Sequence, residues 1–194
     1  MNAEKQNSLI KEAHENAVRH GFWAEQLSDE HFLCLVICEL AEAVEAKRNG
    51  SYCLQENWQF FEERIAEQPS QHEAATEAER YTYWFEHFVK DTLGDELADA
   101  YIRLCDLAGA HDIVVKEHRG MLCYVVSEES TFTENVLAID GMLTDGSMSI
   151  DGRLLFGMRQ VERLAELEHV ELLKHIEYKM RYNKLRKHKH GKAF

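Results

Sequence analysis

Two pairs of acidic residues with three-residue spacing lie inside stretches that are otherwise apolar. The first pair is Glu39 and Glu42 in the run ELAE, and the second is Glu96 and Asp99 in the run ELAD. Residues three apart lie on one face of an α-helix, so each pair can direct two carboxylates toward one point. Four carboxylates that converge between helices repel one another and lose hydration, and a divalent cation relieves both costs. The pairs therefore favour a fold in which two helices meet around a metal ion.

The ligand type indicates which metal such a site would bind. Oxygen ligands alone favour Mg²⁺, or Mn²⁺, over Zn²⁺, which prefers His and Cys. A di-iron centre in a helical bundle uses Glu-x-x-His pairs, and this chain has one such pattern, Glu166 to His169, outside both acidic pairs. Acidic pairs also occur on solvated helix faces, so an incidental surface role is the alternative for either pair alone.

The composition predicts an all-α fold. The chain has 194 residues, which suit one domain with a sizeable core, and 45% of them are hydrophobic. A single proline, Pro69, interrupts a sequence rich in helix formers. No apolar run approaches the ~20 residues of a membrane span, and the start lacks a signal-peptide core. Five cysteines without a C-x-x-C pattern suit reduced thiols. We therefore expect a cytoplasmic protein without a membrane partner.

Hydrophobic periodicity and capping signals place the individual elements. The expected helices are 3–19, 28–48, 88–110, 131–143 and, as one helix or a pair, 153–186. Residues 51–86 are less regular, with a polar loop at about 67–79, and a turn-rich loop is expected over 144–152. The β-branched stretches 113–115 and 123–126 would also suit short strands. In total we expect a bundle of five to seven helices.

Charge is distributed unevenly along the chain. The net charge is −13, which argues against binding of long nucleic acid by counter-ion release. Residues 179–194, however, contain seven Lys or Arg and no acid. An acidic body with a basic end suits a small polyanion that binds partly through a metal, although a solvated basic terminus is the alternative.

Four short motifs occur in order along the chain. They are GFW at 21–23, ELAEA at 39–43, DELADA at 95–100 and K-x3-N-x2-R-x2-KHGK at 179–192. Over about residues 8–112 and 172–194, the chain resembles the MazG-like all-α nucleoside triphosphate pyrophosphohydrolases. The resemblance implies that an ExxE helix and an ExxD helix bind Mg²⁺, and that water attacks the α-phosphorus to give a monophosphate and pyrophosphate. It also implies a homo-oligomer, a dimer or tetramer, because family members usually pair through helices.

The resemblance implies roles for the two acidic pairs. Glu39, Glu42, Glu96 and Asp99 would be the metal ligands and the catalytic residues, with the phosphates completing an octahedral shell. The physical reason is that the α-phosphorus is shielded by negative oxygens, so attack needs cations that neutralise them and orient a hydroxide.

Basic and aromatic residues would bind the substrate. Lys179 and Arg186 lie seven residues apart, nearly on one helix face, and would reach the β- and γ-phosphates with Asn183 between them. Lys189 and Lys192 would help if the tail folds over the ligand.

The run at 21–23 offers an aromatic ring to the base. Trp23 or Phe22 would stack on it, and the alternative for Trp23 is a core or subunit contact.

The chain departs from shorter family members in two places. In those members the acidic pairs lie closer together, and the ExxD helix leads almost directly to the last helix. We treat residues 1–194 as a single MazG-like domain with insertions at about 51–86 and 114–170. The second insertion would cover the pocket or build an oligomer contact.

The sequence thus predicts Mg²⁺-dependent hydrolysis of nucleoside triphosphates, with deoxynucleoside triphosphates as the favoured class, in cleaning of the nucleotide pool. One alternative is a non-catalytic nucleotide-binding or regulatory protein on the same fold. Another is a structural helical protein whose acidic pairs are incidental.

Overall fold

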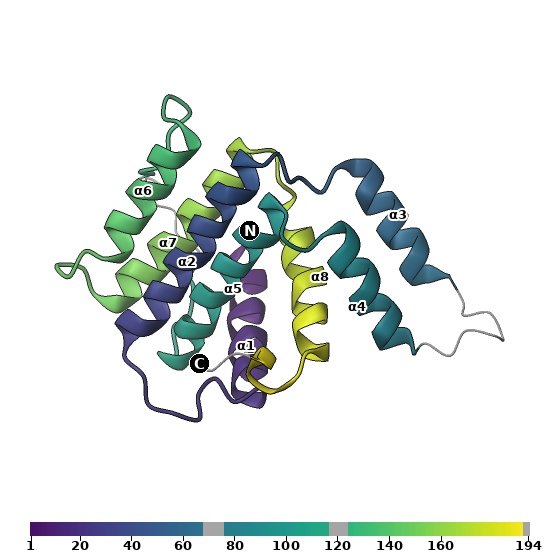
Figure 1. The fold of residues 1–194 in the computed structure, drawn as a ribbon. Helices are drawn as coiled ribbons and strands as arrows, with labels where there is room; N and C mark the ends of the chain where they lie inside the picture. The colour runs from purple at the N-terminus through teal and green to yellow at the C-terminus, as the bar shows by residue number, and fades with distance from the viewer. Residues whose placement is uncertain (68–75, 117–123, 192–194) are drawn as a thin grey trace.

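The computed structural model describes residues 1–67, 76–116 and 124–191 (Figure 1). Within these residues the protein is all-α, as predicted, with eight α-helices and a short 3₁₀-helix at His188–Gly191. The α-helices are α1 (Ala3–Arg19), α2 (Asp29–Arg48), α3 (Gln55–Ala66), α4 (Glu77–Phe88), α5 (Leu93–Ala110), α6 (Phe132–Leu143), α7 (Ile150–Leu167) and α8 (Leu172–Leu185). None of the described helices is both long and apolar enough to cross a membrane.

The bounds of α1, α2 and α6 are close to those predicted, and each helix begins at a capping side chain. Asn2 caps α1, and Ser28 accepts a hydrogen bond from the backbone N–H of His31 at the start of α2. Thr131 and Glu134 form the expected capping box of α6. These side chains satisfy N–H groups that the first turn of a helix leaves without partners. The expected helix or pair over 153–186 is a pair, α7 and α8.

The number of helices was predicted wrongly, because segment 51–86 is more helical than expected. It contains α3 and most of α4. Thr76 and Glu79 form a capping box that opens α4 inside the predicted polar loop, of which residues 68–75 lie outside the described ones. Both helices bury aromatic side chains against each other, so tertiary packing stabilises elements whose local sequence pattern is weak.

The starts of α5 and α7 also differ from the prediction, whereas α5 ends at Ala110 as expected. α5 begins at Leu93 rather than near residue 88, because Asp91 adopts a left-handed backbone conformation with φ 60° that separates α4 from α5. α7 begins at Ile150, inside the expected loop. Residues 113–115 and the described part of the second β-branched stretch, 124–126, form no strand, and residue 123 lies outside the described chain.

α5 is the central helix of the bundle. It packs against α1, α2, α7 and α8 (Figure 1), and most of its side chains are buried. Leu97, Ala100 and Leu104 lie in the main hydrophobic core, to which α6 and α7 also contribute. A helix that is apolar on nearly every side is typical of such a central position. The acids of α5 are therefore placed in the interior of the protein.

A second, aromatic cluster joins α3 and α4 to α8. Phe61 and Phe85 are fully buried, and the ring of Phe85 stacks on that of Tyr182 with centroids 4.6 Å apart. The hydroxyl of Tyr81 donates a hydrogen bond of 2.6 Å to the carbonyl oxygen of Tyr178. In Figure 1, α3 and α4 lie side by side beyond α8. This cluster fixes α8 on the side that faces away from α1.

The basic C-terminal segment folds back onto the acidic body. The backbone N–H of Lys189 donates to the carbonyl oxygen of His20 at 2.8 Å, next to the end of α1. The ammonium of Lys189 pairs with Glu25, and Lys184 pairs with Glu12. These contacts hold the end of α8 and the segment after it against α1 and the residues that follow α1.

We predict that Gly109→Ala lowers the free energy of unfolding by about 1–3 kcal/mol. A Cβ at this position would lie 2.5 Å from the Cβ of His14 and 3.2 Å from the carbonyl oxygen of Ile10, so α1 and α5 would have to separate. As a control, Gly141→Ala in α6 adds a Cβ with nothing within 4 Å. It should raise stability by about 0.5–1 kcal/mol. Urea denaturation followed by circular dichroism measures both, and equal effects would contradict the importance of this close approach.

Candidate metal centre

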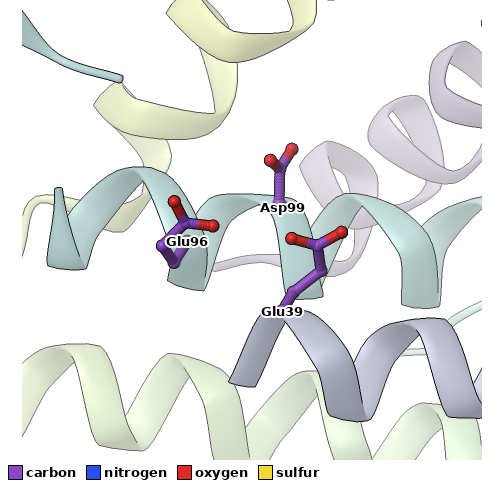
Figure 2. A group of neighbouring side chains, drawn as sticks. All are labelled: Glu39, Glu96 and Asp99. Carbon is purple, nitrogen blue, oxygen red and sulfur yellow. The ribbon is translucent and has the colours of Figure 1, made fainter. Parts of the chain in front are cut away.

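Three of the four predicted acids converge in the interior (Figure 2). Glu39 on α2 and Glu96 and Asp99 on α5 each offer a carboxylate oxygen, and these oxygens lie within 4.8 Å of one another. Glu39 is 5% exposed and Glu96 is 4% exposed, whereas Asp99 is half-buried. The three-residue spacing puts Glu96 and Asp99 on the same face of α5, and Glu39 approaches that face from α2. Three carboxylate oxygens at this separation are a donor set that a hard divalent cation prefers.

The fourth acid, Glu42, lies outside this group. It is exposed one helical turn beyond Glu39, and it lines the same pocket as the other three.

The carboxylates form part of one pocket that four helices enclose. Its volume is about 210 Å³, so it is far larger than a water-sized void. α8 contributes Lys179 and Asn183 to its lining, and Arg186, which directly follows α8, also lines it; these three were predicted to bind phosphate. The remaining described lining residues are Ala13, Asn16, Ala17, Phe22, Phe32, Leu35, Lys90, Asp91, Ile102, Arg103 and Asp106.

Two basic side chains contact the acids. Nε of Arg103 donates to Oε1 of Glu39 at 2.6 Å. Nζ of Lys179 lies 2.7 Å from Oδ2 of Asp95 and 2.7 Å from Oδ2 of Asp99. Lys179 is thus buried between two aspartates of α5, and in this arrangement its charge is directed at them.

Asp95, which directly precedes Glu96 on α5, is completely buried. Its Oδ2 accepts hydrogen bonds from Lys179 and from the backbone N–H of Asp91. Its Oδ1 has no hydrogen-bond partner among the residues that the structure describes. Asp91, Asp95 and Glu96 also offer oxygens within 4.8 Å of one another, so the acidic group continues toward the start of α5.

Burial disfavours the charged forms of these acids. Burial, together with the neighbouring charges of Asp99 and Asp95, raises the pKa of Glu96 to about 9. Burial also raises the pKa of Glu39, although Arg103 opposes the effect. Burial of Lys179 by itself would lower its pKa, but Asp95 and Asp99 raise it above its usual value. At neutral pH Glu96 is therefore protonated, while Lys179 remains charged.

The other predicted substrate-binding residues are more dispersed. Trp23 does not line the pocket; its indole donates to Oδ1 of Asp106 at 2.8 Å, and its ring stacks on Phe32 with centroids 4.3 Å apart. Phe22 and Phe32 line the pocket instead. Lys189 pairs with Glu25, and Lys192 lies outside the described residues.

The polar pocket residues that sequence reasoning missed include Arg103, Asp106 and Asn16. Arg103 and Asp106 follow Asp99 by four and seven residues, so helical periodicity places both on the face that carries Glu96 and Asp99. That signal was available in the sequence. The sequence held no such signal for Asn16, because this residue reaches the pocket through the packing of α1 against α5.

Comparisons of the chain with protein-family models, with curated proteins and with solved structures find no match. The function is therefore inferred from the geometry and chemistry of the pocket. The most specific part of that geometry is the convergence of Glu39, Glu96 and Asp99.

We predict that the metal-free protein becomes less stable as the pH rises from about 6 to about 9. The pKa of Glu96 is near 9 in the folded protein and 4.5 ordinarily, so ionisation increasingly favours the unfolded chain over this interval. Glu96→Gln, which cannot ionise, should show a flatter pH dependence. Mg²⁺ or Mn²⁺ should restore the stability of the unmodified protein most strongly at the high end of this pH range. Urea denaturation in EDTA and in metal measures this, and parallel pH profiles for the two proteins would contradict it.

We also predict that Lys179→Met lowers the free energy of unfolding by about 3–5 kcal/mol, because it leaves buried Asp95 without its cation. The matched control is Lys184→Met on the same helix, where an exposed ion pair with Glu12 is lost. That loss should cost about 1 kcal/mol or less. Chemical denaturation of both variants tests the difference. Similar losses of stability in the two variants would show that the buried ion pair contributes no more to stability than the exposed one.

Proposed function

We propose that this protein is a Mg²⁺-dependent nucleoside triphosphate pyrophosphohydrolase of the MazG-like family. It would release pyrophosphate and a monophosphate, with deoxynucleoside triphosphates as the favoured substrates and nucleotide-pool cleaning as the role. The observation that carries the proposal is the convergence of Glu39, Glu96 and Asp99 in a pocket that Asn183 of α8 and the adjoining Arg186 also line. One part of the pocket suits a hard cation, and another suits phosphate oxygens.

The charge of the pocket supports a substrate that arrives with metal. Six acidic and four basic side chains of the described residues line it, so the lining carries an excess of negative charge even with Glu96 protonated. A bare triphosphate would be repelled by this lining. A triphosphate that is neutralised by divalent cations would be accepted, because the carboxylates then become its ligands.

The donor set fits Mg²⁺ or Mn²⁺. Glu39, Glu96 and Asp99 would hold the ion, with Glu42 near enough along α2 to contribute at the pocket rim. A bound ion would neutralise the phosphoryl oxygens and lower the pKa of a coordinated water.

Other side chains would position the substrate. Asn183 is buried, and its Oδ1 has no hydrogen-bond partner within the described part of the chain. The amide is thus placed to bind a ligand group in the pocket. Arg186, near the end of α8, would contact phosphate oxygens, and Phe22 and Phe32 provide apolar rings for the nucleoside.

The decisive experiment is incubation of the purified protein with each common deoxynucleoside triphosphate and Mg²⁺, followed by product analysis. Pyrophosphate and a monophosphate support the proposal. Orthophosphate and a diphosphate would assign a different hydrolase. Binding without turnover would instead favour a non-catalytic nucleotide-binding protein.

We predict that Glu39→Gln, Glu96→Gln and Asp99→Asn each reduce kcat by roughly a hundredfold or more, because each removes a ligand for the ion that stabilises the transition state. The control is Glu45→Gln, on the same helix as Glu39, where an exposed carboxylate pairs with Arg48 outside the pocket. Its kcat should be unchanged. Steady-state kinetics, with circular dichroism to verify folding, tests the set. Unchanged turnover in all three acid variants would refute the site.

A further inference from the structure

A buried carboxylate lies in the pocket beyond the metal-binding acids. Asp106 on α5 lines the same pocket, and its side chain is 15% exposed. Its Oδ1 accepts hydrogen bonds from Nε1 of Trp23 at 2.8 Å and from Nδ1 of His14 at 2.9 Å. Because both bonds use Oδ1, Oδ2 is left as an acceptor for a ligand in the pocket. The two donors also fix the orientation of the carboxylate.

Asn16 on α1 offers a second polar group to this pocket. It is 8% exposed, and its Oδ1 is buried with no hydrogen-bond partner among the described residues. Buried amides in proteins nearly always have a partner, so an orphan beside a pocket indicates a place where a ligand can complete the hydrogen bonding.

The surroundings of these polar groups suit a flat heterocycle. Phe22, Phe32 and Ile102 line the pocket and supply apolar and aromatic surface. Asp106 follows Asp99 by seven residues, which is about 10 Å along the axis of α5. This separation leaves room for a sugar between phosphates at the carboxylate group and a base at Asp106.

Building on the proposed function, we propose that Asp106 and Asn16 form a base-recognition site that selects nucleotides whose base carries an exocyclic amino group, such as cytosine or adenine. Oδ2 of Asp106 would accept a hydrogen bond from the amino group. The Asn16 amide can turn to donate or accept, so it would pair with the adjacent ring position whatever that position requires.

The selectivity follows because an ionised carboxylate cannot donate a hydrogen bond. Uracil and cytosine have nearly the same shape but differ in carrying an oxygen or an amino group at the same position. An ionised carboxylate can only accept hydrogen bonds, so the uracil oxygen would face it with repulsion and leave it unpaired. Hydrogen-bonding sites reject an analogue that lacks the matching group far more strongly than apolar pockets reject a change of size.

The test compares dCTP with dUTP in hydrolysis by the full chain with Mg²⁺, and dATP with dITP as a purine pair. We expect kcat/KM to be at least about tenfold higher for the amino-bearing member of each pair. Asp106→Asn keeps an acceptor for Trp23 and His14 but can turn an amide N–H₂ toward the base. It should bring the dCTP to dUTP ratio to within about threefold of one. The matched control is Asp140→Asn, a partly buried aspartate of α6 outside the pocket lining, which should keep the ratio of the unmodified protein.

The outcomes separate this inference from the proposed function. Equal hydrolysis of dCTP and dUTP, or a preference for dUTP, overturns the base assignment while the pyrophosphohydrolase stands. If no nucleotide is hydrolysed, the proposed function fails, and calorimetric titration with dCTP and dUTP in Mg²⁺ decides the base assignment. Tighter binding of dCTP then supports it, and equal or absent binding overturns it. If Asp106→Asn does not fold, the dCTP to dUTP ratio of the unmodified protein alone decides the base assignment.

Discussion

The burial of α5 is the constraint on which the rest of the structure depends. This helix carries Asp95, Glu96, Asp99 and Asp106 but has neighbours on almost every side, so its acids lose most of their hydration. Two of the neighbouring helices, α1 and α8, bring hydrogen-bond donors or positive charge to these acids as well as apolar surface. α8 supplies Lys179 to two of the acids, and α1 supplies His14 to Asp106. Arg103, from α5 itself, reaches across to Glu39 on α2 and so links the two helices of the metal centre. The positions of α1, α2 and α8 thus serve both the core and the charge balance of α5.

The sequence was most informative where local chemistry determines structure. Ser28 and Thr131 mark helix starts because each satisfies backbone N–H groups of its own first turn, and the structure places α2 and α6 accordingly. The sequence was least informative where contacts between residues distant in sequence determine the structure. α3 buries Trp58 and Phe61 against α4 and α8, and only those contacts distinguish it from an irregular segment. The break before α5 depends on the left-handed backbone of Asp91, which no strong signal announces.

The same division applies to the candidate site. The spacing of Glu96 and Asp99 predicted two acids on one helix face, and the structure brings Glu39 to them from α2. The contacts of Lys179 could not be read from spacing, because a basic residue at a helical position looks the same whether it faces solvent or a buried aspartate. The role of Asn16 could not be predicted for a similar reason. Only the folded surroundings show that its Oδ1 has no hydrogen-bond partner among the described residues. Helical periodicity finds residues that share a face, and packing decides what that face meets.

Protons, Lys179 and, under the proposed function, a divalent cation would compete for the carboxylates of this candidate centre. Burial makes Glu96 retain a proton at neutral pH, and Lys179 already neutralises part of the charge of Asp99. Asp95 is fully buried and also bonded to Lys179, so the lysine has a partner even if Asp99 turns to a metal ion. The low polarity that raises the pKa of Glu96 also strengthens its attraction for a divalent ion once the proton leaves. Binding of the proposed ion would therefore be coupled to release of a proton, and the affinity for that ion would rise with pH because Glu96 must ionise to become a ligand.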